Sequence, residues 1–186
     1  MIIVLTGGPG TGKTAVARAL ASLLKFKVLN EKAFCRKNKI GHTHSGELVV
    51  NAREFEEKLY KHVAQHKNLI IEGHMISNVK LPADYVFVLR TSLPELEARL
   101  SQRFYSDLKV WDNVIVEGLD YCRECAGINY EKNKIFEVDT TGKTPSLIAR
   151  RISEIIKGSE KGDSVNWSRD LGKKVKKSGR LLGKKQ

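Results

Sequence analysis

Short runs of apolar residues recur along the chain and predict buried strands. The five runs are rich in β-branched or aromatic side chains and are continuous rather than alternating: residues 2–5, 26–29, 69–71, 85–89 and 135–138. Continuous apolar runs of this length are typical of strands that are buried on both faces of a parallel sheet. The pattern therefore predicts a sheet of five parallel strands.

Segments with helical periodicity separate these runs. Apolar residues recur three and four positions apart in segments 13–25, 52–66 and 107–122, and in a last segment that begins at Thr144-Pro145. Another helix is expected to begin near Thr91, where a hydroxyl residue precedes a proline. Segment 107–122 is expected to be one helix, with an apolar stripe made by Leu108, Trp111, Ile115 and Leu119. Strands that alternate with helices indicate a doubly wound α/β fold, with helices on both faces of the sheet.

The composition is that of one globular domain. Of 186 residues, 41% are hydrophobic and 29% are charged, which excludes a coiled coil, a collagen and a wholly disordered chain. No apolar run approaches the roughly 20 residues that span a bilayer, and no signal peptide is visible, so we expect a cytoplasmic protein. The three cysteines, an odd number, suit a reducing compartment.

The positive charge is concentrated at the C-terminal end. The net charge is +12, and residues 157–186 hold ten Lys or Arg against three Asp or Glu. Because few large apolar residues lie there, we expect one globular domain over residues 1–156 and a basic, flexible tail over residues 157–186. A run of this charge favours a polyanion such as RNA, and a solubilising extension is the equal alternative.

The most specific motif follows the first predicted strand. Residues 7–14 read Gly-Gly-Pro-Gly-Thr-Gly-Lys-Thr, the complete P-loop pattern G-x-x-x-x-G-K-[ST] at a strand-to-helix junction. In such a loop the backbone N–H groups cradle phosphates, Lys13 reaches the β- and γ-phosphates, and the Thr14 hydroxyl ligates Mg²⁺. The motif predicts nucleoside triphosphate binding, and the lack of an N-K-x-D motif argues against a GTPase.

A carboxylate and an imidazole are expected beside the P-loop. The third predicted strand ends in Glu72-Gly73-His74, at the same edge of the sheet as the P-loop. Glu72 is the candidate Mg²⁺ ligand or base. His74 is expected to point to the same side if the extended conformation continues, and a turn histidine without a chemical task is the less favoured alternative.

Two arginines and one loop complete the predicted site. Arg99 and Arg103 are four residues apart, which puts them on one face of the predicted helix. Planar cations at that position neutralise charge on a transferring phosphate, and we favour this role over that of a solvated surface pair. The loop of residues 139–145 follows the last predicted strand and is expected to lie against an adenine edge.

Together these residues resemble the adenylate kinase 6 family, also called the Fap7 family, in its archaeal form. The resemblance covers residues 1–156 and rests on the P-loop, the carboxylate-x-His sequence, Phe-Val-Leu-Arg-Thr at 87–91 and Arg-Leu-x-x-Arg-x-Tyr at 99–105. It implies a monophosphate-binding segment near residues 28–51 and a short lid near residues 103–113. It also implies adenylate kinase and ATPase activities with ATP and Mg²⁺, and a role in small-ribosomal-subunit maturation through a ribosomal protein of the uS11 type.

The resemblance also implies roles for single residues. It assigns the ATP phosphates to the P-loop and the start of its helix: Gly10, Gly12, Lys13, Thr14 and Ala15. It makes Arg103 the lid arginine and places Lys143 beside the adenine. Together with the motifs described above, the predicted catalytic residues are Lys13, Arg103, Glu72 and His74, and the predicted metal ligands are Thr14 and Glu72. The chain departs from the family where Glu72 replaces an Asp and where Asn30-Glu31 lacks the expected Asp, so the accepted monophosphate is left open.

Three weaker patterns are interpreted without a metal. His42 and His44 fit a polar loop over the acceptor, and His62 and His66 fit a helix surface. Cys122-x-x-Cys125 has no second cysteine pair and is interpreted as two thiols near a helix end.

The leading hypothesis is a transferase that moves the γ-phosphate of Mg-ATP to AMP or a related nucleoside monophosphate. The second hypothesis is an ATP-switched ribosome-assembly factor whose main activity is ATP hydrolysis. Kinases for other small acceptors, such as shikimate or dephospho-coenzyme A, are disfavoured because their acceptor motifs are absent.

Overall fold

The computed structural model describes residues 1–44 and 47–182, and a parallel sheet lies at its centre. Its strands are β1 (Ile2–Thr6), β2 (Lys27–Asn30), β5 (Leu69–Glu72), β6 (Tyr85–Arg90) and β7 (Ile135–Asp139). They are ordered β2-β5-β1-β6-β7, and every neighbouring pair is parallel. The prediction of a five-stranded parallel sheet is confirmed.

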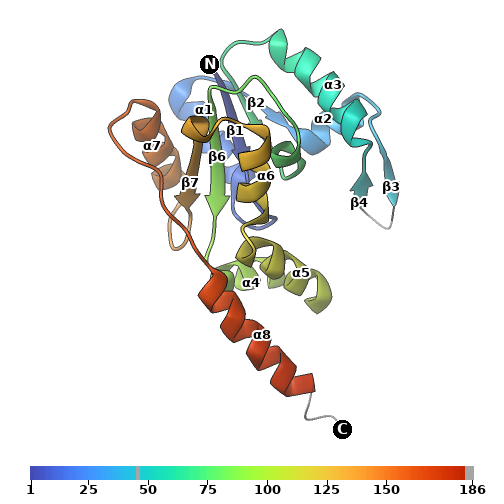
Figure 1. The fold of residues 1–186 in the computed structure, drawn as a ribbon. Coiled ribbons are helices and arrows are strands. Elements are labelled where there is room, and N and C mark those ends of the chain that lie inside the picture. The colour runs from blue at the N-terminus through green and yellow to red at the C-terminus, as the bar shows by residue number, and fades with distance from the viewer. Residues whose placement is uncertain (45–46, 183–186) are drawn as a thin grey trace.

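Helices cover both faces of this sheet, as predicted (Figure 1). They are α1 (Lys13–Leu24), α2 (Glu31–Lys37), α3 (Ala52–Ala64), α4 (Leu93–Ser101), α5 (Asp107–Gly118), α6 (Tyr121–Asn129), α7 (Pro145–Ile156) and α8 (Ser168–Leu182), with short 3₁₀ turns η1 (Met75–Asn78) and η2 (Lys132–Lys134). A two-stranded antiparallel hairpin, β3 (His42–His44) and β4 (Glu47–Val49), connects α2 to α3. No helix in the described part of the chain is both long enough and apolar enough to cross a membrane.

The alternation of side chains along each strand divides the core into two layers. In β1, Ile3 and Leu5 pack with α1 and α7 on one face, while Ile2 and Val4 pack with α2, α3 and α6 on the other. Both sets are buried, which is why the strands read as continuous apolar runs in the sequence. The P-loop therefore leaves β1 between two filled layers.

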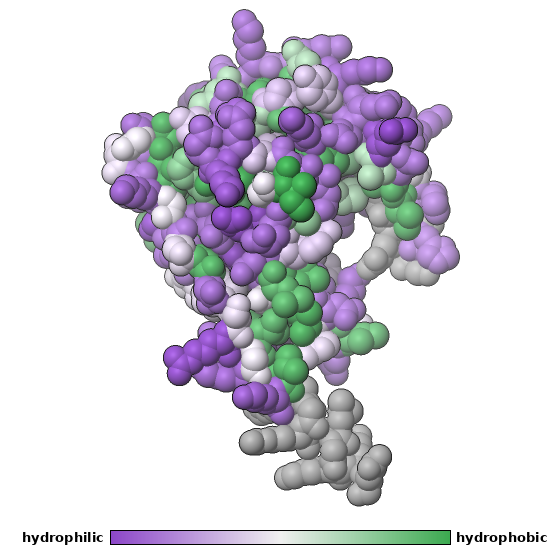
Figure 2. Space-filling model, in the orientation of Figure 1, coloured by the Kyte–Doolittle hydropathy of each residue, from purple (hydrophilic) through white to green (hydrophobic). Residues whose placement is uncertain are grey.

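The single helix expected over residues 107–122 is wrong. The chain turns at Asp120, whose φ of 57° is left-handed, so that α5 ends and α6 begins there. Asp tolerates this conformation, and the Asp120 carboxylate pairs with the buried guanidinium of Arg90. The predicted apolar stripe is also wrong, because the side chains of Leu108 and Leu119 are 71% and 62% exposed. Exposed aliphatic side chains on α5 agree with the hydrophobic area that Figure 2 shows at its position.

A flexible tail that begins directly after Ile156 is also wrong, because the chain makes specific contacts with the domain before α8. The Asp163 carboxylate accepts a hydrogen bond from the Asp139 backbone at 2.8 Å and pairs with Arg151 at 2.7 Å. Farther along, Trp167 and Leu171 pack into a cluster with apolar side chains of α4 and α5. Few apolar residues lie in this segment, but they occupy the positions that face the domain.

These contacts generate a prediction about two truncations. A chain that ends at Ile156 and a chain that ends at Gly172 both lose a net charge of +7. Only the shorter chain loses Asp163, Trp167 and Leu171, so we expect its free energy of unfolding to fall by about 3–5 kcal/mol, while that of the longer chain changes by less than about 1 kcal/mol. Urea unfolding measures both. Equal unfolding midpoints for the two truncated chains would show that the segment adds no stability.

Candidate functional site

The P-loop backbone lies tightly against the carboxyl ends of the strands. Gly7 has a φ of 139°, and a Cβ atom there would lie 2.4 Å from the Leu89 carbonyl oxygen of β6. Only glycine fits this close approach. The loop then opens directly into α1, whose first N–H groups and positive dipole end point to the space above the sheet.

Lys13 lies inside this loop. Its ammonium donates hydrogen bonds to the carbonyl oxygens of Gly7 and Gly8, both at 2.9 Å. Burial lowers the pKa of Lys13, and nearby acidic side chains, among them Glu31 and Glu72, oppose that shift. The ammonium is thus held where phosphate oxygens can replace the carbonyl partners.

Glu72 and Thr14 meet at the mouth of the loop. Glu72 ends β5, the neighbour of β1, and its carboxylate is 2% exposed. Its Oε1 accepts hydrogen bonds from the Thr14 hydroxyl at 3.1 Å and from the Asn30 side-chain amide. A hydroxyl and a carboxylate are hard oxygen donors, so the residues present fit the Mg²⁺ that the P-loop motif implies.

Glu31 is a buried residue of the cavity wall to which the sequence analysis gave no role. Its two carboxylate oxygens accept the backbone N–H groups of His74 and Met75 at 2.8 and 2.9 Å. A Cβ atom at Gly73 would lie 1.9 Å from this carboxylate, so a larger residue there would displace the Glu31 side chain. Burial raises the pKa of Glu31, and the bonds from the His74 backbone and the charge of Lys13 oppose the rise. Only the fold brings Glu31 beside Gly73, so no local sequence pattern marks it.

His74 reaches the site by a different backbone path from the one expected. The strand ends at Glu72, and His74 leads into the 3₁₀ turn η1, so the assumption of a continued extended conformation is wrong. Its ring Nδ1 nevertheless lies 3.3 Å from the Gly7 carbonyl oxygen and 3.4 Å from the Cys122 sulfur. Burial, followed by the nearby charge of Lys13, lowers the pKa of His74, which keeps the imidazole neutral.

The two arginines do not act as a pair. Arg103 lies beyond the end of α4 and lines the same cavity as Lys13. Arg99 lies against the back of the P-loop instead, where it donates to the Gly10 carbonyl oxygen at 3.2 Å and pairs with Glu95 at 2.5 Å. The guanidinium of Arg99 fixes the loop, and only Arg103 remains available to a phosphate.

Lys143 lies in the loop that follows β7. Its ammonium donates to the Asp139 carbonyl oxygen at 2.8 Å, and the neighbouring Gly142 N–H donates to Glu95 at 2.8 Å. Lys143 is not among the residues that line the cavity at Lys13. Its contact with an adenine stays a prediction.

One cavity of about 360 Å³ joins most of the predicted residues. Its walls come from the P-loop and α1, from the start of α2, from the end of β5 and from the segment after α4: Pro9, Gly10, Gly12, Lys13, Thr14, Ala15, Arg18, Asn30, Glu31, Lys32, Glu72, Gly73, His74, Arg103 and Tyr105. The cavity thus extends from the phosphate loop to the segment expected to bind a monophosphate. Four basic side chains in its walls suit the binding of phosphate groups: Lys13, Arg18, Lys32 and Arg103.

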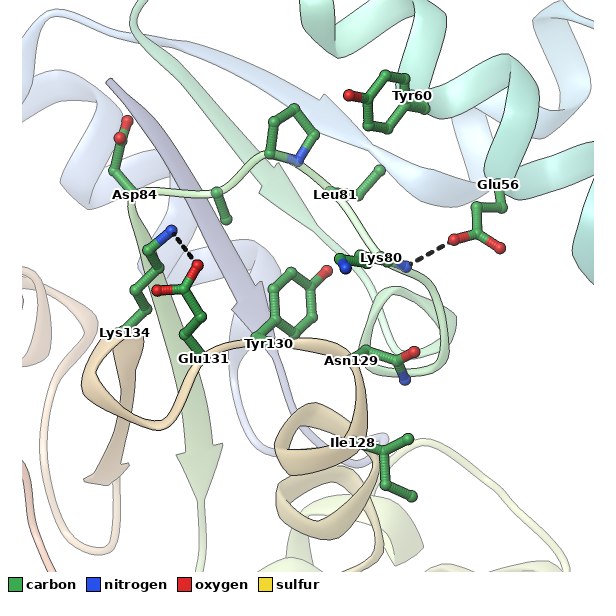
Figure 3. A pocket seen from close by; sticks show the side chains of 12 residues that line it. Glu56, Tyr60, Lys80, Leu81, Asp84, Ile128, Asn129, Tyr130, Glu131 and Lys134 are labelled. Carbon is green, nitrogen blue, oxygen red and sulfur yellow. Dashed lines mark hydrogen bonds and ion pairs between the residues drawn. The ribbon is translucent and has the colours of Figure 1, made fainter.

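A larger cavity of about 660 Å³ lies near the opposite ends of the strands (Figure 3). It has no glycine-rich loop, and its acidic groups already have partners. Glu56 accepts the Lys80 backbone N–H, Glu131 pairs with Lys134, and Asp84 accepts the Ile2 backbone N–H. Nothing in its walls resembles a phosphate site.

The histidine and cysteine patterns form no metal cluster in residues 1–44 and 47–182. His42 and His44 lie on the β3–β4 hairpin. The ring of His62, on α3, stacks at 4.3 Å on the ring of His66, two residues past the end of α3. Cys122 and Cys125 lie on α6, and the Cys122 sulfur contacts His74.

Comparisons with known proteins show the family of this chain. A family model described as an AAA domain matches residues 3–120. A protein named "Putative adenylate kinase" from Pyrococcus furiosus is 38% identical over 174 residues, which cover 91% of this chain and 92% of that protein. A protein of the same name from Thermococcus kodakarensis is 34% identical over 170 residues, which cover 90% of this chain and 93% of that protein.

Solved structures share the fold. Shikimate kinase from Acinetobacter baumannii, in complex with shikimate, superposes with a TM-score of 0.60 at 22% identity, over 86% of this chain and 94% of that one. Thymidylate kinase from Candida albicans superposes with a TM-score of 0.54 at 15% identity, over 84% of this chain and 91% of that one. At such identities the likeness shows the fold alone.

The geometry at Lys13 predicts the effect of removing its charge. Because an ammonium that meets phosphate oxygens makes charge-assisted hydrogen bonds, Lys13→Ala is expected to weaken nucleoside triphosphate binding about 10- to 100-fold. The exposed helical Lys61 provides the control, since Lys61→Ala removes the same charge outside the cavity. Calorimetric titration of both variants with a nucleoside triphosphate measures the two affinities. Equal losses of affinity would show that Lys13 does not contact the bound phosphates.

Proposed function

The chain belongs to this AAA-domain family of P-loop proteins and to its archaeal, adenylate kinase-like group, and from that premise we propose that it transfers the γ-phosphate of ATP to AMP. The observation that carries the proposal is the single cavity shared by the P-loop and the Asn30–Lys32 side. A phosphate donor on Lys13 and a phosphate acceptor near α2 would face each other across it. A fold likeness to a shikimate kinase at 22% identity does not outweigh this arrangement.

Charge stabilisation is the main task of the protein in this reaction. An acceptor phosphate is already ionised, so no protein base has to remove a proton. Lys13 from the loop and Arg103 from the segment after α4 line the same cavity and would neutralise the charge of the transferring phosphoryl group. Closing the segment of residues 103–113 over the cavity would exclude water.

Thr14 and Glu72 are the proposed magnesium ligands, directly or through water. Bound Mg²⁺ supplies neutralisation of the phosphate charges. The carboxylate of Glu72 and the hydroxyl of Thr14 hold each other in place at 3.1 Å before any ligand arrives. We further propose that Gly10, Gly12 and Ala15 contact the donor phosphates and that Lys143 lies beside the adenine.

His74 supports a second activity, hydrolysis of ATP without a monophosphate. A neutral imidazole at 3.3 Å from the Gly7 carbonyl oxygen lies beside the phosphate loop, where it would orient an attacking water. A water nucleophile, unlike a phosphate, has a proton to lose.

The basic α8 supports a role in ribosome assembly as the second candidate function. Seven Lys or Arg and no Asp or Glu follow Gly172, and five of the seven belong to α8, which gives this helix the chemistry of an RNA ligand. In this proposal the chain is a cytoplasmic protein of the Fap7 type, and it acts in small-subunit maturation with a ribosomal protein of the uS11 type and with RNA.

The kinase proposal predicts that ADP formation depends on AMP. With Mg-ATP and AMP we expect two molecules of ADP to form per AMP consumed. We also expect ADP to form at least about 10-fold faster than without AMP, because the binding energy of AMP then helps to stabilise the transition state. A coupled assay with AMP, CMP, GMP and UMP measures this. ADP formation that no monophosphate accelerates would leave only the ATPase.

The proposed role of His74 predicts unequal losses. His74→Ala should lower ATP hydrolysis without AMP by about 100-fold and lower AMP phosphorylation by much less, because only water needs its proton removed. His66→Ala, whose ring lies outside the cavity, is the matched control. Equal losses of the two activities in the His74 variant would rule out this division of tasks.

RNA binding through α8 predicts a change in salt dependence. The chain that ends at Gly172 keeps the packing of Trp167 and Leu171 but loses the Lys174–Glu97 ion pair and seven positive charges, so its affinity for small-subunit RNA should fall. The slope of log affinity against log salt should become shallower by about 0.7 per lost phosphate contact on single strands. Filter binding at several salt concentrations gives both values. An unchanged slope would mean that α8 does not touch the RNA.

A further inference from the structure

Two cysteines lie one helical turn apart next to the phosphate site. Cys122 and Cys125 are the second and fifth residues of α6, and both are free thiols. Residues three apart on a helix face the same side, with about 5–6 Å between their Cβ atoms. Because a disulfide needs Cβ atoms about 3.5–4.5 Å apart, joining the two sulfurs requires a local tightening of this turn of α6.

Cys122 contacts the site through His74. Its sulfur lies 3.4 Å from His74 Nδ1, and that nitrogen lies 3.3 Å from the Gly7 carbonyl oxygen. The same carbonyl accepts the ammonium of Lys13 at 2.9 Å. A displacement of the Cys122 sulfur therefore acts on the imidazole that faces the P-loop.

The two thiols differ in access to solvent. Cys122 is buried, and burial raises its pKa to about 12, so it does not react first. Cys125 is partly exposed and lies beside Tyr121, which is 42% exposed. An oxidant in solution reaches Cys125, and Cys122 is the neighbouring thiol that resolves the product.

We propose that Cys122 and Cys125 form a redox modification site whose oxidant is a peroxide. The peroxide oxidises the Cys125 thiol to a sulfenic acid and is itself reduced to water or an alcohol. The Cys122 sulfur then attacks the Cys125 sulfur, the S–O bond breaks, and the hydroxyl group leaves as water with the Cys122 proton. The disulfide draws the Cys122 sulfur along α6 and removes it from His74.

The third cysteine serves as an internal reference. Cys35 is on α2, and its side chain is completely buried in the core cluster. Because the Cys35 side chain is completely buried, an oxidant in solution does not reach it, whereas Cys125 is partly exposed.

The first test is chemical and does not depend on the proposed function. The full chain is reduced, treated with hydrogen peroxide and digested without reductant. We expect the peptide with Cys122 and Cys125 to be lighter by two hydrogen atoms in the parent and in Cys35→Ser, and not in Cys125→Ser. A peptide of unchanged mass, or a sulfinic acid on Cys125 without the disulfide, would overturn the proposal.

The second test follows His74. The NMR signals of the His74 ring should shift on oxidation of the parent and recover with dithiothreitol, while those of Cys125→Ser should not change. ATP hydrolysis without AMP should fall about threefold to tenfold on oxidation, the rate equivalent of one lost hydrogen bond.

The hydrolysis assay alone rests on the proposed function. A disulfide that leaves the His74 signals unshifted contradicts the link to the site. A shift without any ATP turnover in the reduced protein contradicts the proposed function and not the redox site. If peroxide lowers ATP hydrolysis equally in the parent and in Cys125→Ser, the loss does not come from the Cys122–Cys125 disulfide, and the proposed redox site is overturned.

Discussion

The close contact between the P-loop backbone and the ends of the parallel strands determines how the site is built. Gly7 approaches the Leu89 carbonyl so closely that a Cβ atom would lie 2.4 Å from it. Because the loop lies this close to the ends of the strands, the Lys13 ammonium, the Glu72 carboxylate and the start of α1 converge at one point. Groups held in advance at the place where phosphate charge gathers stabilise it without reorganisation.

A second close contact stabilises the α2 side of the cavity. The Glu31 carboxylate occupies the space beside Gly73 and accepts two backbone N–H groups at the start of η1. A buried carboxylate is costly unless it accepts hydrogen bonds and lies near a positive charge, and here the two N–H groups and the charge of Lys13 meet both conditions. This arrangement connects α2 and the His74 turn to the P-loop.

Local patterns were sufficient for the sheet and for the phosphate loop, because continuous apolar runs and the P-loop spacing are properties of short segments. Lys13, Thr14, Glu72, His74 and Arg103 were identified correctly as neighbours of one cavity. The break at Asp120, the bracing role of Arg99 and the packing of Leu171 depend on partners far away in sequence, which periodicity does not reveal. Glu31 was missed for the same reason, since only the fold brings it to Gly73.

The central claim is that one cavity holds two nucleotides end to end, and a bisubstrate ligand tests it most directly. Two adenosines joined through five phosphates should bind one molecule per chain in the presence of Mg²⁺. Linking donor and acceptor should make this binding at least about 100-fold tighter than that of ATP or AMP alone. Calorimetric titration of the full chain measures stoichiometry and affinity together. Binding of the linked compound no tighter than ATP would contradict a shared donor and acceptor site.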